Sequence, residues 1–159
     1  MPQPVPEGYH TITPYLAVDS ATEAIDFYQR AFGAKERVRM DGPQGSIMHA
    51  ELEIGDSLIM LSDPFPQAST KTPKELGGTT ISIFAYVEDI DSVYKQAIDA
   101  GASSLMEPDD MFWGDRFGSV QDPFGHSWTI ATHVEDVSPE EIEKRSEEFM
   151  SQMAGSPSS

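Results

Sequence analysis

Three ionisable side chains stand at alternate positions of one short segment. His49, Glu51 and Glu53 alternate with apolar residues between positions 46 and 54, so they share one face of a predicted β-strand. A histidine beside a carboxylate pairs a general base with the group that orients it. If this face lines a pocket, His49 and Glu51 are the candidate catalytic residues. If it faces water, as one face of an antiparallel sheet commonly does, they are ordinary surface residues.

A second group of residues could contact a ligand. Phe112 and Trp113 are followed by a glycine and then by Asp115 and Arg116. The rim of a ligand pocket often combines an aromatic stacking surface with a few aimed polar groups. We therefore predict that Phe112, Trp113 and Arg116 bind a ligand, while packing of the two aromatic rings against the strands remains an equal alternative.

Several kinds of chemistry are excluded by composition. The chain has no cysteine, so thiol catalysis, disulfides and thiolate metal sites are absent. It contains no glycine-rich phosphate loop and no Ser-His-Asp set. The other histidines, His10, His126 and His133, stand singly beside predicted turns or strand ends, where we expect structural or surface roles.

The charge of the chain also limits its partners. Asp and Glu number 27 against 10 Lys and Arg, which gives a formal net charge of −17. Such a charge repels phosphate backbones and anionic lipid, so we expect no nucleic-acid partner. No apolar run approaches the roughly 18 residues of a membrane helix, and residues 1–8 do not resemble a signal peptide. We therefore expect a cytoplasmic protein without a membrane partner.

An internal repeat positions these residues. Residues 16–34 and 85–102 each read as a strand, a cap, a helix and a glycine stop, at an offset of about 69 residues. In the first copy we predict a strand over 12–18, a helix capped by Ser20 and ended by Gly33, and strands over 36–40, 46–54 and 57–61. In the second copy we predict a strand over 80–87, a helix over 91–100, and strands over 103–106, 116–121 and 127–133.

These elements predict one domain made of two modules. Module one covers about 10–64, a linker 65–78, and module two 79–133, and we expect a disordered tail over 155–159. Ser138 and Pro139 begin a predicted helix over 138–153. Its apolar positions Ile142, Phe149 and Met153 are sparse, which suits either a strap over the domain or a contact with a partner.

Three motifs carry a resemblance to a known family. They are IMHAELEIGD over 47–56, FWGDRFG over 112–118 and DPFGH over 122–126. Together with the duplication they resemble the vicinal oxygen chelate superfamily of glyoxalase I, bleomycin-resistance proteins and extradiol dioxygenases, and within it the PhnB-like branch. The resemblance implies an α+β fold in which two βαβββ modules form a curved mixed sheet around a central cavity, with a C-terminal helix added here.

The resemblance also implies where a metal ion would bind. Enzymes of the family hold one divalent ion with His, Gln or Glu on the first and last strands of each module. The matching positions here are Thr13 and Ser82 on the first strands, and Ile59 and Thr129 on the last. Because a divalent ion needs imidazole or carboxylate donors, we expect no metal and no other cofactor. The alternative is one divalent ion with His49 and Glu51 as recruited ligands.

The function implied by the resemblance is the binding of a small organic ligand between the modules, as bleomycin-resistance proteins sequester a drug. Tyr15 shares a strand face with Thr13, and Phe84 shares one with Ser82, so we predict that these four residues and Thr129 line the cavity with the aromatic segment above. An acidic pocket would favour a cationic ligand. The alternative is a metal-dependent lyase, transferase or dioxygenase, and the sequence does not decide whether the chain is an enzyme. Relatives often pair, so we expect a homodimer.

Overall fold

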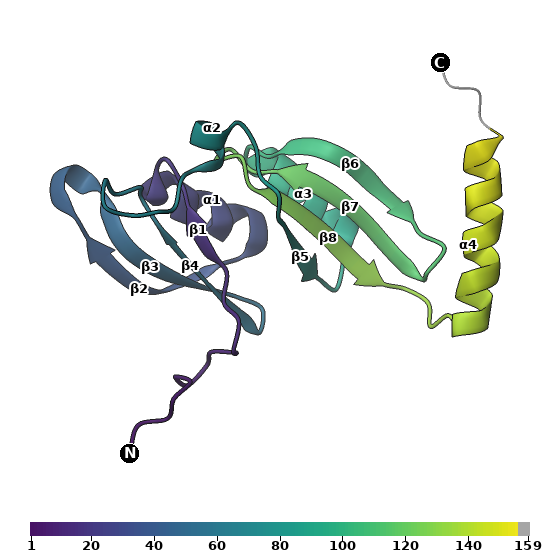
Figure 1. Cartoon of the computed structure of the whole chain (residues 1–159), viewed down its shortest axis with the longest axis horizontal. Helices are drawn as coiled ribbons and strands as arrows, with labels where there is room; N and C mark the ends of the chain where they lie inside the picture. The colour runs from purple at the N-terminus through teal and green to yellow at the C-terminus, as the bar shows by residue number, and fades with distance from the viewer. Residues whose placement is uncertain (156–159) are drawn as a thin grey trace.

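The computed structural model describes residues 1–155, and most of the predicted 155–159 tail lies outside the described residues. Module one contains β1 (Tyr15–Ala17), α1 (Ala21–Phe32), β2 (Lys35–Asp41), a short 3-10 turn (Pro43–Gly45), β3 (Ile47–Ile54) and β4 (Ser57–Ser62). Its strands form one sheet in the order β1-β4-β3-β2 (Figure 1). The β1–β4 pair is parallel, and the other pairs are antiparallel.

Module two repeats this topology. It contains β5 (Ser82–Tyr86), α3 (Ile90–Ala100), β6 (Ser103–Asp110), β7 (Asp115–Gln121) and β8 (Ser127–His133), with a short helix α2 (Pro73–Leu76) in the preceding connection. The strand order β5-β8-β7-β6 matches that of module one, again with one parallel pair, β5–β8. The predicted α+β fold with two βαβββ modules is confirmed, and its strands pair as two four-stranded sheets.

The first helix shows how local sequence builds each module. α1 places Ala24, Phe27, Tyr28 and Ala31 on one buried face, as the predicted spacing requires. Gly33 ends the helix with a φ of 66°. Ser20 occupies the N-cap position but makes no side-chain cap hydrogen bond, so that part of the prediction is wrong. Instead, the side chain of Asp63, which follows β4, accepts a hydrogen bond from the Ala21 N–H at 3.0 Å.

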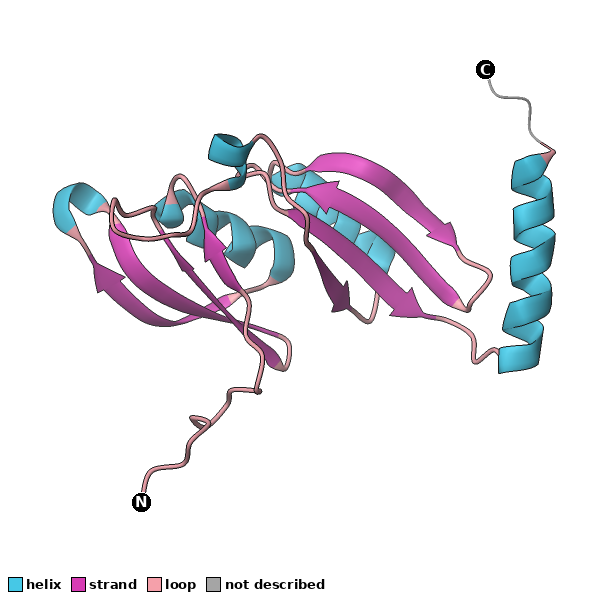
Figure 2. Cartoon of the chain, viewed as in Figure 1, coloured by secondary structure: helices cyan, strands magenta, loops and turns pink. Residues whose placement is uncertain are grey.

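A single core joins the modules through their helices. α1 and α3 pack against one another, and the Phe32 ring lies 4.4 Å from that of Trp128 on β8, centroid to centroid. Polar bonds cross the same boundary, since the Gln96 amide donates to the Ala31 carbonyl at 3.0 Å and the His126 ring contacts the Ala17 carbonyl at 2.9 Å. The helices therefore fix the relative placement of the two modules, which lie side by side along the long axis (Figure 2).

In each module a helix packs on one face of the sheet. The opposite face, which we call the open face, carries half-exposed aromatic side chains: Tyr15 is 46% exposed on module one, and Phe84 and Tyr86 are 49% and 64% exposed on module two. Burial of such rings is normally a large stabilising contribution, so their exposure on both sheets makes the two open faces candidate contact surfaces.

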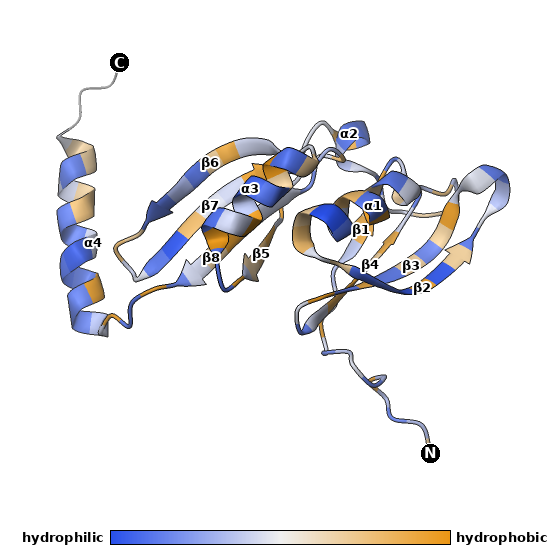
Figure 3. Ribbon diagram, turned by 180° about the vertical axis from the view of Figure 1, so that it is seen from behind, coloured by the Kyte–Doolittle hydropathy of each residue, from blue (hydrophilic) through white to orange (hydrophobic). Residues whose placement is uncertain are grey.

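The C-terminal helix α4 (Pro139–Ala154) stands at the far end of module two and does not lie across either sheet (Figure 1). Its Arg145 pairs with Glu135 at 2.9 Å, and its Phe149 ring contacts Phe112 in the β6–β7 turn. The helix is mostly hydrophilic, with separate apolar positions that include the exposed Met150 and Met153 (Figure 3). Over residues 1–155, none of the helices has both the length and the apolar composition of a membrane-spanning helix.

Candidate functional site

The open face of module one brings together an acidic and an imidazole side chain in apolar surroundings. Strand register sets Glu51 beside both Val38 and Met60, and His49 beside Met40. Ala50 and Leu52, the alternate residues of β3, are buried in the core with α1. His49 and Glu51 therefore lie on the sheet face opposite the helix, as the period of a strand requires.

Three side chains on this face form a continuous hydrogen-bonded chain. The Tyr15 hydroxyl lies 3.1 Å from His49 Nδ1, and His49 Nε2 lies 3.0 Å from Glu51 Oε1. The side chains of His49 and Glu51 are 23% and 18% exposed, so both are largely shielded from water. The strand order places Tyr15 on β1 two strands away from His49 on β3, so the tyrosine reaches across β4 to the histidine.

Tyr9 completes this cluster from the N-terminal segment. The Tyr9 hydroxyl, followed by His49, lowers the pKa of Glu51 and so favours its ionised form. Burial, together with the Glu51 carboxylate, raises the pKa of Tyr9 to about 12. Within residues 1–155 the buried Tyr9 oxygen has no partner that meets the full geometric criteria for a hydrogen bond. Its interaction with Glu51 is therefore a polar contact. No periodic signal in the sequence pointed to Tyr9, which precedes the first strand.

A cavity of about 320 Å³ adjoins Glu51, the last side chain of this hydrogen-bonded series. The N-terminal segment forms one wall and the open face of module one the other. Its lining residues are Pro4, Val5, Pro6, Tyr9, His10, Thr11, Thr13, Glu51 and Met60. The predicted ligand contact Thr13 thus lines the same cavity as Glu51. The volume of this cavity is at the lower end of the range for small-molecule pockets.

The open face of module two gathers hydroxyl groups beside aromatic rings. Thr129 Oγ1 lies 3.0 Å from Ser82 Oγ and 3.2 Å from Ser119 Oγ. The Phe84 and Tyr86 rings are 5.1 Å apart, centroid to centroid, on the neighbouring strand. The structure therefore brings together Ser82, Phe84 and Thr129, three of the predicted ligand contacts.

A buried carboxylate marks one end of this face. Asp115 accepts from the Tyr86 hydroxyl at 2.9 Å and the Trp113 indole at 3.1 Å, and it lies 2.8 Å from His133 Nδ1. Burial raises the pKa of Asp115, but the hydrogen bonds from His133, Tyr86 and Trp113 outweigh it and leave that pKa below its usual value. His133 Nε2 lies 2.8 Å from Asp136, and the hydrogen bonds to Asp115 and Asp136 raise the pKa of His133. The Trp113 indole thus lies beside Asp115 at the end of this face, and its contact with a ligand stays a prediction.

Two predicted ligand residues do not share this face. Arg116 lies on the helix side of β7, where its guanidinium pairs with Asp91 of α3 at 2.9 Å and with Asp110 at 3.3 Å. Phe112 packs against Phe149 of α4. Strand alternation along β7 turns Arg116 toward α3, while Phe112 in the preceding turn contacts both Phe149 and the Trp113 ring.

The residues at the metal positions of the family do not fit a divalent ion. Tyr15 pairs with Met60 in module one, and the equivalent Phe84 pairs with Thr129 in module two. Met60 is therefore the counterpart of Thr129, and the predicted position, Ile59, is wrong by one residue. Ile59 is buried in the core. Thr13, Met60, Ser82 and Thr129 supply no imidazole or carboxylate. Within residues 1–155 no group of three or more His, Asp or Glu is arranged to hold a metal ion.

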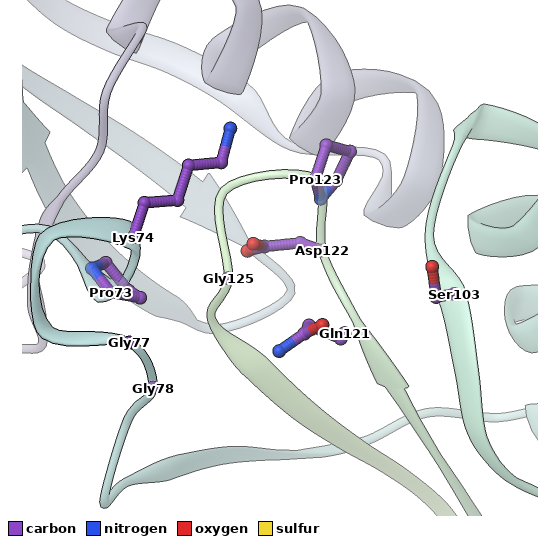
Figure 4. A pocket seen from close by; sticks show the side chains of 9 residues that line it. All are labelled: Pro73, Lys74, Gly77, Gly78, Ser103, Gln121, Asp122, Pro123 and Gly125. Carbon is purple, nitrogen blue, oxygen red and sulfur yellow. The ribbon is translucent and has the colours of Figure 1, made fainter.

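A second hollow, of about 340 Å³, lies between α2 and the β7–β8 turn (Figure 4). Its two charged side chains already have partners. Lys74 pairs with Asp19 at 2.8 Å, and Asp122 accepts hydrogen bonds from the Tyr28 hydroxyl and the Trp128 indole. We assign no chemistry to this hollow.

Comparison with known proteins identifies the family. The model of the Glyoxalase/Bleomycin resistance protein/Dioxygenase superfamily matches residues 8–130. The uncharacterized protein Rv0887c of Mycobacterium tuberculosis is 43% identical over 135 residues, covering 83% of this chain and 79% of that protein. YjdN of Escherichia coli is 26% identical over 140 residues, covering 75% and 92%.

Solved structures share the fold. TioX from Micromonospora sp. ML1 superimposes with a TM-score of 0.63 at 28% identity, covering 79% of this chain and 99% of that one. The Bacillus cereus PhnB protein, described as a putative 3-demethylubiquinone-9 3-methyltransferase, gives a TM-score of 0.61 at 22% identity over 77% and 99%. The matched residues span both modules and both open faces. The chain therefore belongs to the Glyoxalase/Bleomycin resistance protein/Dioxygenase superfamily.

Proposed function

We propose that the chain binds a small aromatic or otherwise apolar organic molecule on the open faces of its sheets, without a metal ion. The observation that carries the proposal is the exposure of Tyr15, Phe84 and Tyr86 beside polar groups held in fixed positions. Aromatic surface with a few convergent polar groups is the usual composition of a small-molecule site. The net charge of −17 favours a ligand that carries positive charge.

Closure of the site is proposed to come from a second copy of the chain. A ligand on one open face alone would keep much of its surface in water, whereas ligand pockets bury most of it. In a homodimer the open face of module one can meet that of module two from the partner, which encloses the ligand between them. The lack of cysteine suits a reducing compartment, so we propose that this binding occurs in the cytoplasm.

The proposal is tested by a thermal-shift screen of aromatic amines, a bleomycin glycopeptide and divalent ions. A ligand of the folded state raises the melting temperature by mass action. We expect shifts with organic compounds, and we expect Phe84→Ala to weaken their binding in equilibrium dialysis. Leu76→Ala is the matched control, because Leu76 is also an exposed apolar residue but lies on α2, away from both open faces. Sedimentation velocity should give a dimer.

Two outcomes would count against this function. Equal loss of binding in Phe84→Ala and Leu76→Ala would show that binding does not depend on the open face of module two. The absence of any organic ligand from the screen, together with a shift by one divalent ion, would favour the alternative of a metal-dependent lyase, transferase or dioxygenase. The observation behind that alternative is the pair of donor side chains, His49 and Glu51, held 3.0 Å apart on an open face. Stoichiometric metal in the purified protein, lost in His49→Gln, would support it.

A further inference from the structure

We propose that Tyr15, His49 and Glu51 form a metal-independent proton relay that removes a proton from an apolar carbon acid bound on the open face of module one. The inference rests on the proposed binding function, because it requires a ligand on this face. It goes further by assigning a class of reaction and a role to each of the three side chains.

The chemistry of the donors and acceptors determines which group donates in each of the two hydrogen bonds. An ionised carboxylate can only accept hydrogen bonds, so the hydrogen of the neutral imidazole lies on Nε2, which donates to Glu51 at 3.0 Å. Nδ1 then presents a lone pair and accepts from the Tyr15 hydroxyl at 3.1 Å. With its hydrogen directed at His49, the Tyr15 oxygen offers its remaining lone pairs to the open side of the sheet.

Apolar side chains surround the relay. Val38, Met40 and Met60 lie beside Glu51 and His49 on the same face and supply apolar neighbours. A bound apolar ligand would exclude more water, and electrostatic interactions within a dry site are stronger than in solution. Glu51 then stabilises the imidazolium that forms when His49 takes up a proton.

The proton transfer needs no additional reactant. A C–H bond of the ligand breaks as its proton passes to the Tyr15 oxygen, while the phenolic proton of Tyr15 passes to His49 Nδ1. The electron pair of the broken bond stays on the ligand as a carbanion, or it expels a leaving group. Tyr15 is therefore the catalytic residue in contact with the ligand, and His49 and Glu51 act through it.

Module two contains a similar set of groups that cannot serve in this way. Both nitrogens of His133 lie 2.8 Å from carboxylates, Asp115 on one side and Asp136 on the other. An imidazolium held between two acceptors carries a hydrogen on each nitrogen and has no lone pair left for a substrate. His49, bonded to one carboxylate and one hydroxyl, instead keeps an acceptor nitrogen in its chain of hydrogen bonds.

The relay is tested on the full chain with 5-nitrobenzisoxazole, an aromatic carbon acid. Removal of its C–H proton breaks the ring N–O bond and releases a coloured cyanonitrophenolate, so a base is detected directly. We expect a rate above that of free imidazole at the same concentration. His49→Gln and Tyr15→Phe should each lower the rate by about 100-fold, the middle of the range for acid–base catalysis.

A matched control and a second measurement separate the relay from a structural role. Tyr94→Phe removes an exposed hydroxyl on α3, bonded to Ser104, and should leave the rate unchanged. Nitrogen NMR of His49 should show the hydrogen on Nε2, with the Nδ1 resonance displaced in Tyr15→Phe. A hydrogen on Nδ1 would overturn the proposal, as would a rate unaffected by His49→Gln or a rate raised by Tyr15→Phe.

Binding of the same probe distinguishes failure of the relay from failure of the proposed function. Equilibrium dialysis reports whether 5-nitrobenzisoxazole binds. Binding without a rate that depends on His49 would overturn the relay and leave ligand binding intact. If neither this probe nor any compound of the thermal-shift screen binds, both proposals fail.

Discussion

The Tyr28 hydroxyl on α1 donates a 2.6 Å hydrogen bond to Asp122 in the turn between β7 and β8, joining the two modules through a buried pair. The same carboxylate oxygen accepts from the Trp128 indole at 2.9 Å. The other oxygen accepts the backbone N–H groups of Phe124 at 3.0 Å and His126 at 2.9 Å. Burial and the adjacent Asp122 raise the pKa of Tyr28, which keeps the phenol protonated as the donor. Four donors thus compensate one buried carboxylate.

Removal of the Tyr28 hydroxyl should destabilise the protein substantially. Tyr28→Phe deletes a donor to a buried charge, and hydrogen bonds to charged groups contribute about 1.5–3 kcal/mol. We expect the free energy of unfolding, measured by urea denaturation, to fall by that amount. Tyr94→Phe removes an exposed hydroxyl and should change it by less than about 0.5 kcal/mol. Similar losses of unfolding free energy in the two variants would show that the hydrogen bond from Tyr28 to Asp122 does not stabilise the fold.

Asp63, rather than Ser20, should be the residue that stabilises the start of α1. Asp63 accepts the Ala21 N–H at 3.0 Å with one oxygen and the Ile47 N–H at 2.7 Å with the other, whereas the Ser20 side chain caps nothing. Asp63→Ala should therefore cost about 1–2 kcal/mol, as the loss of a helix cap does. Ser20→Ala should be neutral in the same urea titration. A larger loss in Ser20→Ala would contradict the assignment.

The fold was predictable because both modules repeat the same local signals. Gly33 and Gly101 end helices at equivalent places, and the Gly55 and Gly125 turns precede the last strand of each module. Such signals depend only on neighbours in the sequence. The hydrogen bond from the Ala21 N–H to Asp63 was not predicted, because that carboxylate lies 42 residues away in the sequence and leaves no local pattern.

The site was predictable only where strand alternation decided it. Alternation correctly put His49 and Glu51 on one face, and Ser82 and Phe84 on another, because a regular strand has a period of two. It failed for Ile59, where a count from the turn was one residue out of register, and a shift of one residue exchanges the two faces of a strand. The contacts of Tyr15 with His49, and of Tyr9 with Glu51, arise from tertiary packing and had no counterpart in the sequence pattern.

Gly114 should be intolerant of substitution. Its φ of 101° is unfavourable for any residue with a β-carbon, and a methyl group there would run into the carbonyl oxygen of Glu135. The Gly114 carbonyl also accepts the N–H groups of Val134 and Glu135, which lead to α4. Gly114→Ala should lower the melting temperature and loosen α4, as seen by hydrogen exchange of its amides. Gly45→Ala is the control, since Gly45 has a φ of 77° but open space around it.

The pH dependence of stability should reveal the pairing of His133. The pKa of His133 is raised by Asp115 and Asp136, so its contribution is fully present below the unfolded imidazole pKa of about 6.5 and is lost as pH rises through the higher folded value. The pKa of Asp115 is lowered, so its contribution is present above its unfolded pKa of about 3.9 and is lost as pH falls through the folded value. Both contributions coexist between about pH 4 and 6.5.

His133→Gln should therefore reduce the free energy of unfolding most within that window. A neutral amide carries no positive charge and has both its donor hydrogens on one nitrogen, so it does not replace an imidazolium between Asp115 and Asp136. The difference from the wild type should shrink as pH rises through the raised folded pKa of His133. Urea titrations from about pH 4.5 to 8.5 measure this difference. His10→Gln is the control, because His10 is exposed and precedes the first strand. A difference that stays constant with pH would show that His133 is not held as an imidazolium between Asp115 and Asp136.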